Sequence, residues 1–283
     1  MTTAMDTGHE PRSASSRFAL PDKRKLLGWS MLTILIGICA FGPMLAPHPI
    51  DAPIGTPGDG PSAAAPLGTD FLGRDVLSRV LNGGASLLLV AAAAVLLTYV
   101  LAITIGMLSG YSQSWLDSLL MRTVDLFLVF PPLLLLLVLV VGVGGGDAVL
   151  ILGIVMVLFP GGARLVRTAT LEVSQSSYVE AAIARGESTT AVLRREILPN
   201  ITPALTADAG VRFLGAIFLV ASLNFLGVGS QPPASNWALM IAENRVIISS
   251  NIWSVLAPAV LLAFVTVAVN LIGDAHSSKL EKS

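Results

Sequence analysis

The sequence of 283 residues has little of what most enzymes and metalloproteins use. Its single cysteine, Cys39, lies in an apolar run, so neither a disulfide framework nor a cysteine-based metal site is available. The three histidines, His9, His48 and His276, are scattered, and no His/Cys/carboxylate cluster indicates a metal centre. There is no G-x-x-x-x-G-K-[S/T] phosphate loop, and no Ser-His-Asp or Cys-His arrangement can be argued. We therefore expect a chain that is not an enzyme and that needs no cofactor or metal.

Charge is scarce too. Only 12% of the residues are charged, 54% are hydrophobic, and the mean hydropathy is +0.78, whereas soluble domains are about 25% charged. A helix needs about 20 mainly apolar residues to cross a bilayer. Because backbone groups in lipid must bond to one another, we predict an all-α integral membrane protein with six transmembrane helices. The six apolar runs are 26–45, 85–109, 124–144, 148–163, 209–229 and 253–273.

Several segments lie between or beside these runs. The polar lead of residues 1–25 is too long for an ordinary signal peptide, so we interpret the first run as a retained anchor. Residues 46–84 would form an extracytoplasmic segment, and residues 85–273 a five-helix core. Prolines at 131, 132, 160 and 258 lie within or at the ends of the runs and are expected to kink or end their helices.

Basic residues orient the chain, because cytoplasmic loops of membrane proteins carry an excess of Lys and Arg. Thirteen basic residues lie on one side: in the tail 1–25, at Arg122, in the loop 164–199 and in the tail 274–283. The opposite loops hold three, Arg74, Arg79 and Arg245. We therefore predict that both termini are cytoplasmic, as is the 164–199 loop, which lies between the fourth and fifth spans.

The 164–199 loop has the pattern of a helix-turn-helix. A helix over 171–185 would place Tyr178, Val179, Ala182 and Ile183 on one face. Gly186 is suited to end this helix in a left-handed conformation. Ser188 or Thr189 could then cap a second short helix, which Pro199 would help to stop. From spacing alone, an interfacial hairpin that packs only against its own bundle fits equally well.

The same loop resembles a known motif. It reads Glu180-Ala181-Ala182, three residues, Gly186, nine residues and then Glu196-Ile197-Leu198-Pro199. This is similar to the EAA loop of permease subunits in binding-protein-dependent ABC importers, although Glu196 stands where the family has Ile. In that family the loop is the cytoplasmic element on which the ATPase docks. The resemblance implies ATPase contacts by Tyr178, Glu180, Ala181, Ala182, Arg185, Gly186, Leu198 and Pro199.

Further segments resemble the second permease of the peptide/opine/nickel branch of this family. They are residues 67–79 (LGTDFLGRDVLSR), 160–167 (PGGARLVR), 224–233 (NFLGVGSQPP) and 270–274 (NLIGD), and they keep the family's order. Two positions depart from it: Ser86 follows Gly83-Gly84-Ala85 where the family often has Arg, and Val220 stands near a frequent Glu. Substrate roles attached to those charges cannot be transferred to this chain.

Ionisable and amide groups inside the spans are candidates for a substrate path. Asp208 and Arg212, four residues apart, could contact the cargo, or could pair with each other while Arg212 extends towards the headgroups. Asn224 could line the path or make an interhelical hydrogen bond. In the 67–79 segment, Asp70, Arg74 and Asp75 could meet a binding protein, or could pair locally at the start of the second span.

The resemblance implies a prokaryotic inner-membrane complex. Its other members would be a homologous permease, two cytoplasmic ATPase subunits or domains, and an extracytoplasmic substrate-binding protein, with membrane lipid around it. The cargo would be di- or oligopeptides, or alternatively nickel chelates, glutathione or opines. A secondary transporter driven by an ion gradient is the rival hypothesis, and it predicts paired intramembrane carboxylates and inverted repeats. A scaffold that does not transport is a third.

Overall fold

The computed structural model describes residues 23–230 and 234–280 of the chain. Within these ranges the protein is all-helical apart from two isolated β-bridges, which join Pro53 to Arg74 and Thr69 to Asp75. The elements in order are α1 (Lys23–Leu45), α2 (Val76–Ser112), α3 (Trp115–Val129), α4 (Pro132–Val143), α5 (Asp147–Ser174), α6 (Ser177–Ala184), α7 (Thr189–Ala191), the π-helix η1 (Val192–Ile197), α8 (Leu198–Phe225), α9 (Trp237–Asn244), the 3₁₀-helix η2 (Arg245–Ile247) and α10 (Trp253–Leu280).

Five helical segments in the described ranges are long and apolar enough to cross a membrane. The predicted third span, 124–144, is not one helix: α3 and α4 meet at an angle of 87° and make a sixth span only if they are counted together. The break follows from Pro131 and Pro132, because a residue that precedes proline is driven out of the α conformation. Phe130 and Pro131 accordingly have extended backbones, with ψ of 134° and 128°.

The helices extend beyond the apolar runs that predicted them. α2 begins at Val76 rather than near residue 85, because the Asp75 side chain caps its first turn by accepting a hydrogen bond from the Ser78 N–H at 3.0 Å. The predicted 46–84 segment therefore ends in more than two turns of helix. Likewise, α5 continues past Arg164, beyond the charge-free stretch that predicted it. α8 begins at Leu198, before its charge-free stretch. Hydropathy marks the part of a helix that lies in lipid, not the whole helix.

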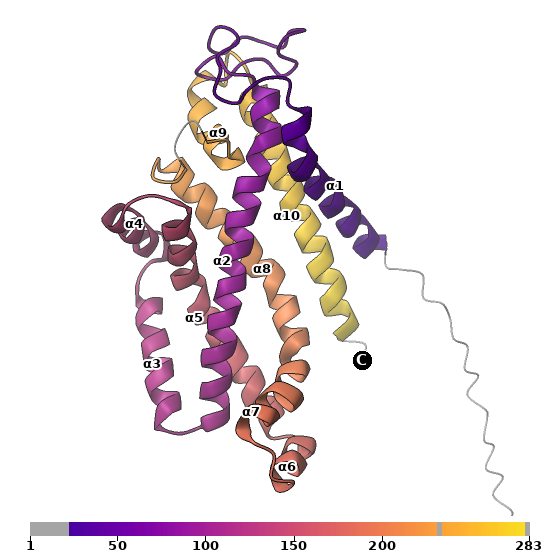
Figure 1. The fold of residues 1–283 in the computed structure, drawn as a ribbon, viewed down its shortest axis with the longest axis vertical. Coiled ribbons are helices and arrows are strands. Elements are labelled where there is room, and N and C mark those ends of the chain that lie inside the picture. The colour runs from indigo at the N-terminus through magenta and orange to yellow at the C-terminus, as the bar shows by residue number, and fades with distance from the viewer. Residues whose placement is uncertain (1–22, 231–233, 281–283) are drawn as a thin grey trace, which may run out of the picture.

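The chain runs back and forth along the long axis of the bundle (Figure 1). α2 packs most extensively on α5, and α1 packs on α10. The contact between α2 and α5 is close because of Gly106, where a methyl group would stand 2.6 Å from Val166 and 2.7 Å from the Ala163 carbonyl. α6 and α7 protrude at one end, while the 46–75 segment and α9 lie at the other (Figure 1).

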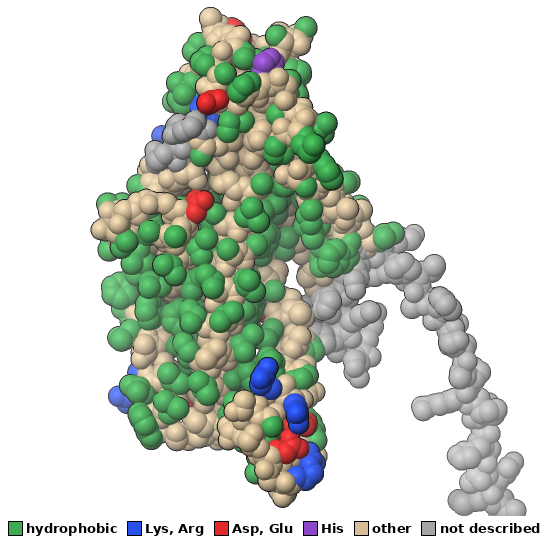
Figure 2. Space-filling view, viewed as in Figure 1, with side chains coloured by type: hydrophobic (Ala, Val, Ile, Leu, Met, Phe, Trp, Pro, Cys, Tyr) green, Lys and Arg blue, Asp and Glu red, His purple; other side chains and the backbone are tan. Residues whose placement is uncertain are grey.

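The distribution of hydrophobic and charged side chains changes along this axis. On the face shown in Figure 2, hydrophobic side chains cover the middle of the bundle, and most of the Lys, Arg, Asp and Glu side chains gather near its two ends. Many of the exposed residues are large and apolar, including Leu89, Leu96 and Val138, which are 67–70% exposed. Such a surface is stable only in contact with lipid or another membrane subunit.

Candidate coupling hairpin and charged clusters

The first candidate site is the protruding hairpin of residues 175–199. The predicted helix over 171–185 is in fact two helices, because α5 ends at Ser174 and α6 begins at Ser177. Two serine hydroxyls bond at the break: Ser174 donates to the Leu171 carbonyl at 2.9 Å and Ser176 to the Val173 carbonyl at 2.6 Å. Such local side-chain bonds compete with the helical backbone. The chain therefore turns before α6.

The turn after α6 is built as predicted. Gly186 has a φ of +82°, and its N–H donates to the Ile183 carbonyl at 2.9 Å. The Glu187 N–H donates to the Ala182 carbonyl at 3.2 Å, which completes a Schellman motif. Ser188 then caps α7 by accepting a hydrogen bond from the Ala191 N–H at 3.4 Å. The predicted left-handed glycine and serine cap are both confirmed.

The far arm of the hairpin differs from the prediction. Pro199 does not stop a short helix, because α7 continues through the π-helix η1 into α8 and Pro199 lies in the first turn of α8. Pro199 has no N–H to donate, and it lies where the i→i+5 bonds of η1 end: the Leu198 N–H before it still donates to the Leu193 carbonyl. The hairpin is therefore continuous with a long span.

The underside of the hairpin packs against the rest of the protein. Val179, Ala182, Val192 and Ile197 are completely buried and belong to a hydrophobic cluster that includes Val166 of α5. Ala182 is completely buried in this chain, so its predicted contact with the ATPase stays a prediction that no exposed side chain supports. The predicted face is also divided, since Tyr178 and Ile183 on the same helix are 41% and 49% exposed.

The outer side of the hairpin is free among the described residues. Arg185 forms an ion pair with Glu187, at 2.7 Å between Nη2 and Oε1. Leu198 is half-buried and lies against the cluster beneath. The remaining residues of the predicted docking surface are exposed, namely Tyr178, Glu180, Ala181, Arg185, Gly186 and Pro199.

A second cluster joins α8 to α2 and α5. Asp208 and Arg212 form the predicted ion pair, with side chains only 16% and 12% exposed. The Tyr99 hydroxyl of α2 donates to Asp208 Oδ2 at 2.7 Å, and Arg212 Nη1 donates to the Leu158 carbonyl of α5 at 2.7 Å. Arg212 thus does not extend along the bundle surface but ties three helices together.

Asn224 is almost completely buried at the other end of α8. Its amide nitrogen donates to the Val220 carbonyl at 2.8 Å, and its carbonyl accepts from the Ser230 N–H at 3.0 Å. These bonds hold the turn that follows α8. A role for Asp208, Arg212 and Asn224 in a substrate path stays a prediction, because in this structure their polar groups are occupied by the protein itself.

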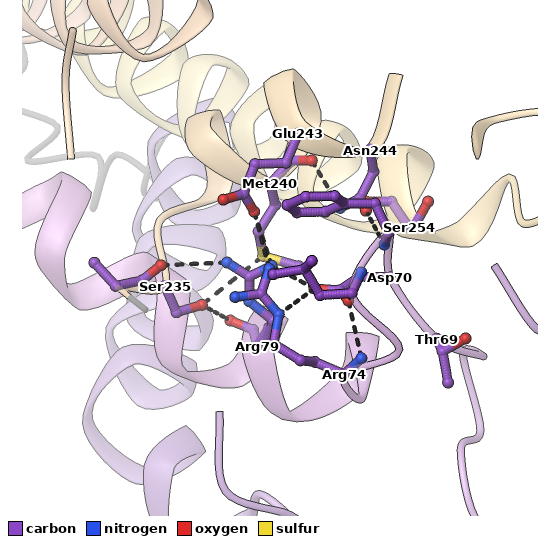
Figure 3. A network of polar contacts seen from close by, with 12 residues as sticks. Thr69, Asp70, Arg74, Arg79, Ser235, Met240, Glu243, Asn244 and Ser254 are labelled. Carbon is purple, nitrogen blue, oxygen red and sulfur yellow. Dashed lines mark hydrogen bonds and ion pairs between the residues drawn. The ribbon is translucent and has the colours of Figure 1, made fainter. Parts of the chain in front are cut away.

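The third cluster lies beside α9, at the end of the bundle away from the hairpin (Figure 1), and its contacts are drawn in Figure 3. Asp70 Oδ2 accepts from Arg74 Nε at 2.7 Å and from Arg79 Nη1 at 2.6 Å, which confirms the predicted pairing of Asp70 with Arg74. Asp75 does not join them; it accepts from the Ser78 N–H. Glu243 of α9 also takes part, with its Oε2 at 2.9 Å from Arg79 and 3.2 Å from Arg74. All four side chains are at most 8% exposed. Two arginines and two carboxylates make the cluster neutral.

Further hydrogen bonds fix the same two segments together. The Phe71 N–H donates to Asn244 Oδ1 at 3.0 Å, and the Asn251 amide donates to the Leu67 and Thr69 carbonyls at 2.9 and 3.0 Å. The Trp237 indole donates to the Val80 carbonyl at 2.8 Å. Sequence reasoning missed these partners, because they lie more than 150 residues away along the chain.

A comparison with known proteins identifies the family. Residues 102–282 match the profile of the family described as binding-protein-dependent transport system inner membrane component. This region contains the hairpin and the Asp208–Arg212 cluster. The chain belongs to this family. It is thus a multi-pass inner-membrane permease of a binding-protein-dependent ABC transporter. The permease is a non-catalytic component, and the system also includes an ATPase, a binding protein and a partner permease.

Three relatives illustrate the range of similar permeases. The di/tripeptide transport system permease protein DppC of Pseudomonas aeruginosa is 34% identical over 90% of this chain and 87% of its own length. The dipeptide transport system permease protein DppC of Bacillus subtilis is 30% identical over 92% and 82%. The glutathione transport system permease protein GsiD of Pectobacterium atrosepticum is 34% identical over 79% and 74%.

Proposed function

We propose that this permease imports di- or oligopeptides, and that it forms the path across the membrane together with a homologous permease. The proposal is supported by the relatives, among which a dipeptide and a di/tripeptide permease match about nine-tenths of the chain. The ordered motifs from residue 67 to residue 274 add to this support, since they resemble the peptide branch of the family.

The hairpin is the proposed docking site of the ATPase. One observation carries this proposal: its outer side presents Tyr178, Glu180 and Ala181 to solvent, while its underside is completely buried in the bundle. A partner that binds the outer side pushes on a rigid body, because Val179 and Ile197 have no space to yield.

The path of such a push can be followed in the structure. The hairpin continues without interruption into α8, where Asp208 and Arg212 hold α8 to Tyr99 of α2 and to the Leu158 carbonyl of α5. Displacement of the hairpin therefore moves three spans together. Two arrangements of the bundle that differ by a few kcal/mol can be exchanged in this way by ATP-driven motion of the ATPase.

A pair of charge-matched variants tests the docking. Glu180→Ala alters the outer side of α6, whereas Glu172→Ala removes a carboxylate that is also exposed, near the end of α5. We expect Glu180→Ala to weaken co-purification of the ATPase and to lower peptide uptake, and Glu172→Ala to leave both unchanged. Equal behaviour of the two variants, with both proteins assembled in the membrane, would refute docking on α6.

The hairpin must face the cytoplasm for this proposal to hold, as must both termini. The test uses a Cys39→Ser background with a single new cysteine at an exposed alanine, either Ala181→Cys on the hairpin or Ala63→Cys at the opposite end. We expect a membrane-impermeant maleimide to label Ala63→Cys in spheroplasts, and to label Ala181→Cys only after permeabilisation. The reverse pattern would contradict the proposed orientation.

Glutathione is a second candidate cargo, because a glutathione permease is 34% identical to this chain over 79% of it. Uptake of a labelled dipeptide into cells that express the complete transporter distinguishes the two. We expect unlabelled dipeptide to compete and glutathione to compete weakly. Strong competition by glutathione alone would reassign the cargo without affecting the role of the hairpin.

A further inference from the structure

A polar groove lies between α3 and α5, outside the sites described above. It is lined by Asp117, Arg122 and Asp125 of α3 and by Arg164 and Arg167 of α5. Its volume is about 460 Å³. A water molecule occupies about 30 Å³ of liquid, so the groove can hold a group much larger than one water or a simple ion.

The charges of the groove do not cancel. Asp117 accepts two hydrogen bonds from Arg167, at 2.7 and 2.6 Å, and Asp125 accepts one from Arg164 at 2.5 Å. Arg122 is exposed and has no ion-pair partner in the part of the chain that the structure describes. The Arg164 side chain is 55% exposed and can accommodate a second acceptor. Three arginines against two carboxylates leave the groove with one uncompensated positive charge.

The sequence shows at which level of the bilayer the groove lies. Residues 126–146 after Asp125, and residues 148–163 before Arg164, contain no charged side chain. Both charge-free stretches therefore end at the Asp125–Arg164 pair, where the two helices touch. Charged side chains that are exposed to lipid are rare in the hydrocarbon core, so this exposed pair marks its edge and Arg122 lies at headgroup level. Trp115, which is 75% exposed at the start of α3, is a residue typical of this interface.

We propose that the groove binds the headgroup of an anionic phospholipid. The phosphate would accept hydrogen bonds from Arg122 and Arg164 and supply the missing negative charge. Its acyl chains would lie along the apolar side of α3 beyond the groove, where Leu126 and Val129 are 64% and 76% exposed. The combination of an unpaired arginine with an adjoining exposed apolar surface favours a lipid over a soluble anion. The inference does not depend on the cargo.

The test is native mass spectrometry of the full-length permease in its purified complex, with phosphatidylglycerol or phosphatidylcholine added in equal amounts. We expect phosphatidylglycerol to be retained preferentially. One basic residue near an anionic surface contributes about 1 kcal/mol, so Arg122→Gln should lower phosphatidylglycerol affinity about fivefold. Arg122→Lys keeps the charge and should retain most of the binding. Arg194→Gln, at an exposed arginine of the hairpin, is the matched control and should change nothing.

Each other outcome overturns the proposal. Equal loss in Arg122→Gln and Arg194→Gln would show general attraction to positive charge, and no loss in either would exclude the groove. Displacement of the lipid by millimolar inorganic phosphate would assign the site to a soluble anion. Binding to the isolated chain but not to the intact complex would show that a partner subunit occupies the groove.

Discussion

Substitution of Arg79 by methionine is the sharpest test of the charged cluster at the end of the bundle that contains α9. The Arg79 side chain is completely buried and holds Asp70 at 2.6 Å, Glu243 at 2.9 Å and the Ala234 carbonyl at 3.2 Å. Arg79→Met leaves two carboxylates with only Arg74, and so places a net negative charge in a site that is at most 8% exposed. Removing one partner of a buried ion pair costs about 3–5 kcal/mol.

The expected loss can be measured as a melting temperature. For chains of this size a destabilisation of 1 kcal/mol lowers Tm by about 2–4 °C, so we expect Arg79→Met to lower Tm by on the order of 10 °C in detergent. Arg194→Met, which removes an exposed arginine without an ion-pair partner in the described ranges, is the control and should shift Tm by less than about 2 °C.

A double variant separates charge from packing. Adding Glu243→Gln to Arg79→Met restores neutrality, because Asp70 and Arg74 remain as a matched pair at 2.7 Å. We expect the double variant to melt higher than Arg79→Met alone, since neighbouring charged groups are coupled by about 0.5–3 kcal/mol. A double variant no more stable than the single one, or a single variant as stable as the control, would refute the reasoning.

Two further predictions concern the hairpin and α8. Gly186→Ala places a side chain on a residue with a φ of +82°, so it should destabilise the chain by about 1 kcal/mol and weaken ATPase binding. Gly142→Ala, in open space on α4, is the control and should do neither. Thermal melting measures stability and co-purification measures ATPase binding; equal effects of the two variants would contradict the role of the turn. Asp208→Asn removes the charge that pairs with Arg212 and should lower uptake severalfold in assembled complexes. Tyr99→Phe removes only a neutral hydroxyl, which contacts Asp208 and the Leu205 carbonyl; a neutral hydrogen bond is worth about 1 kcal/mol, so this variant should act mildly. Unchanged uptake in Asp208→Asn would show that the pair does not transmit motion.

The sequence predicted most of the helical architecture because burial in lipid imposes a strong and simple pattern. Apolar runs located the spans, and the left-handed glycine and the serine cap of the hairpin followed from local backbone chemistry, as Gly186 and Ser188 show. These features depend on residues close together in the chain, so a single sequence is sufficient to predict them.

The errors arose where an element depends on its surroundings. Pro199 was expected to stop a helix, but the helix continues past it from the π-helix η1 into α8, and only the structure shows this. The break at Pro131 and Pro132 was expected from the prolines, but its angle of 87° was not. The partnership of Arg79 with Glu243 spans 164 residues of sequence, and nothing local to either residue indicates it.

The π-helix η1 determines which way the hairpin faces. Val192 and Ile197 are five residues apart and both completely buried, yet in an α-helix of 3.6 residues per turn they would point about 140° apart. The wider i→i+5 turn brings them onto one side. Deleting one residue between Val192 and Ile197 would let the segment relax into an ordinary α-helix. The hairpin would then rotate about the axis of α8, so the residues of the proposed docking surface would all be present but would face a different direction.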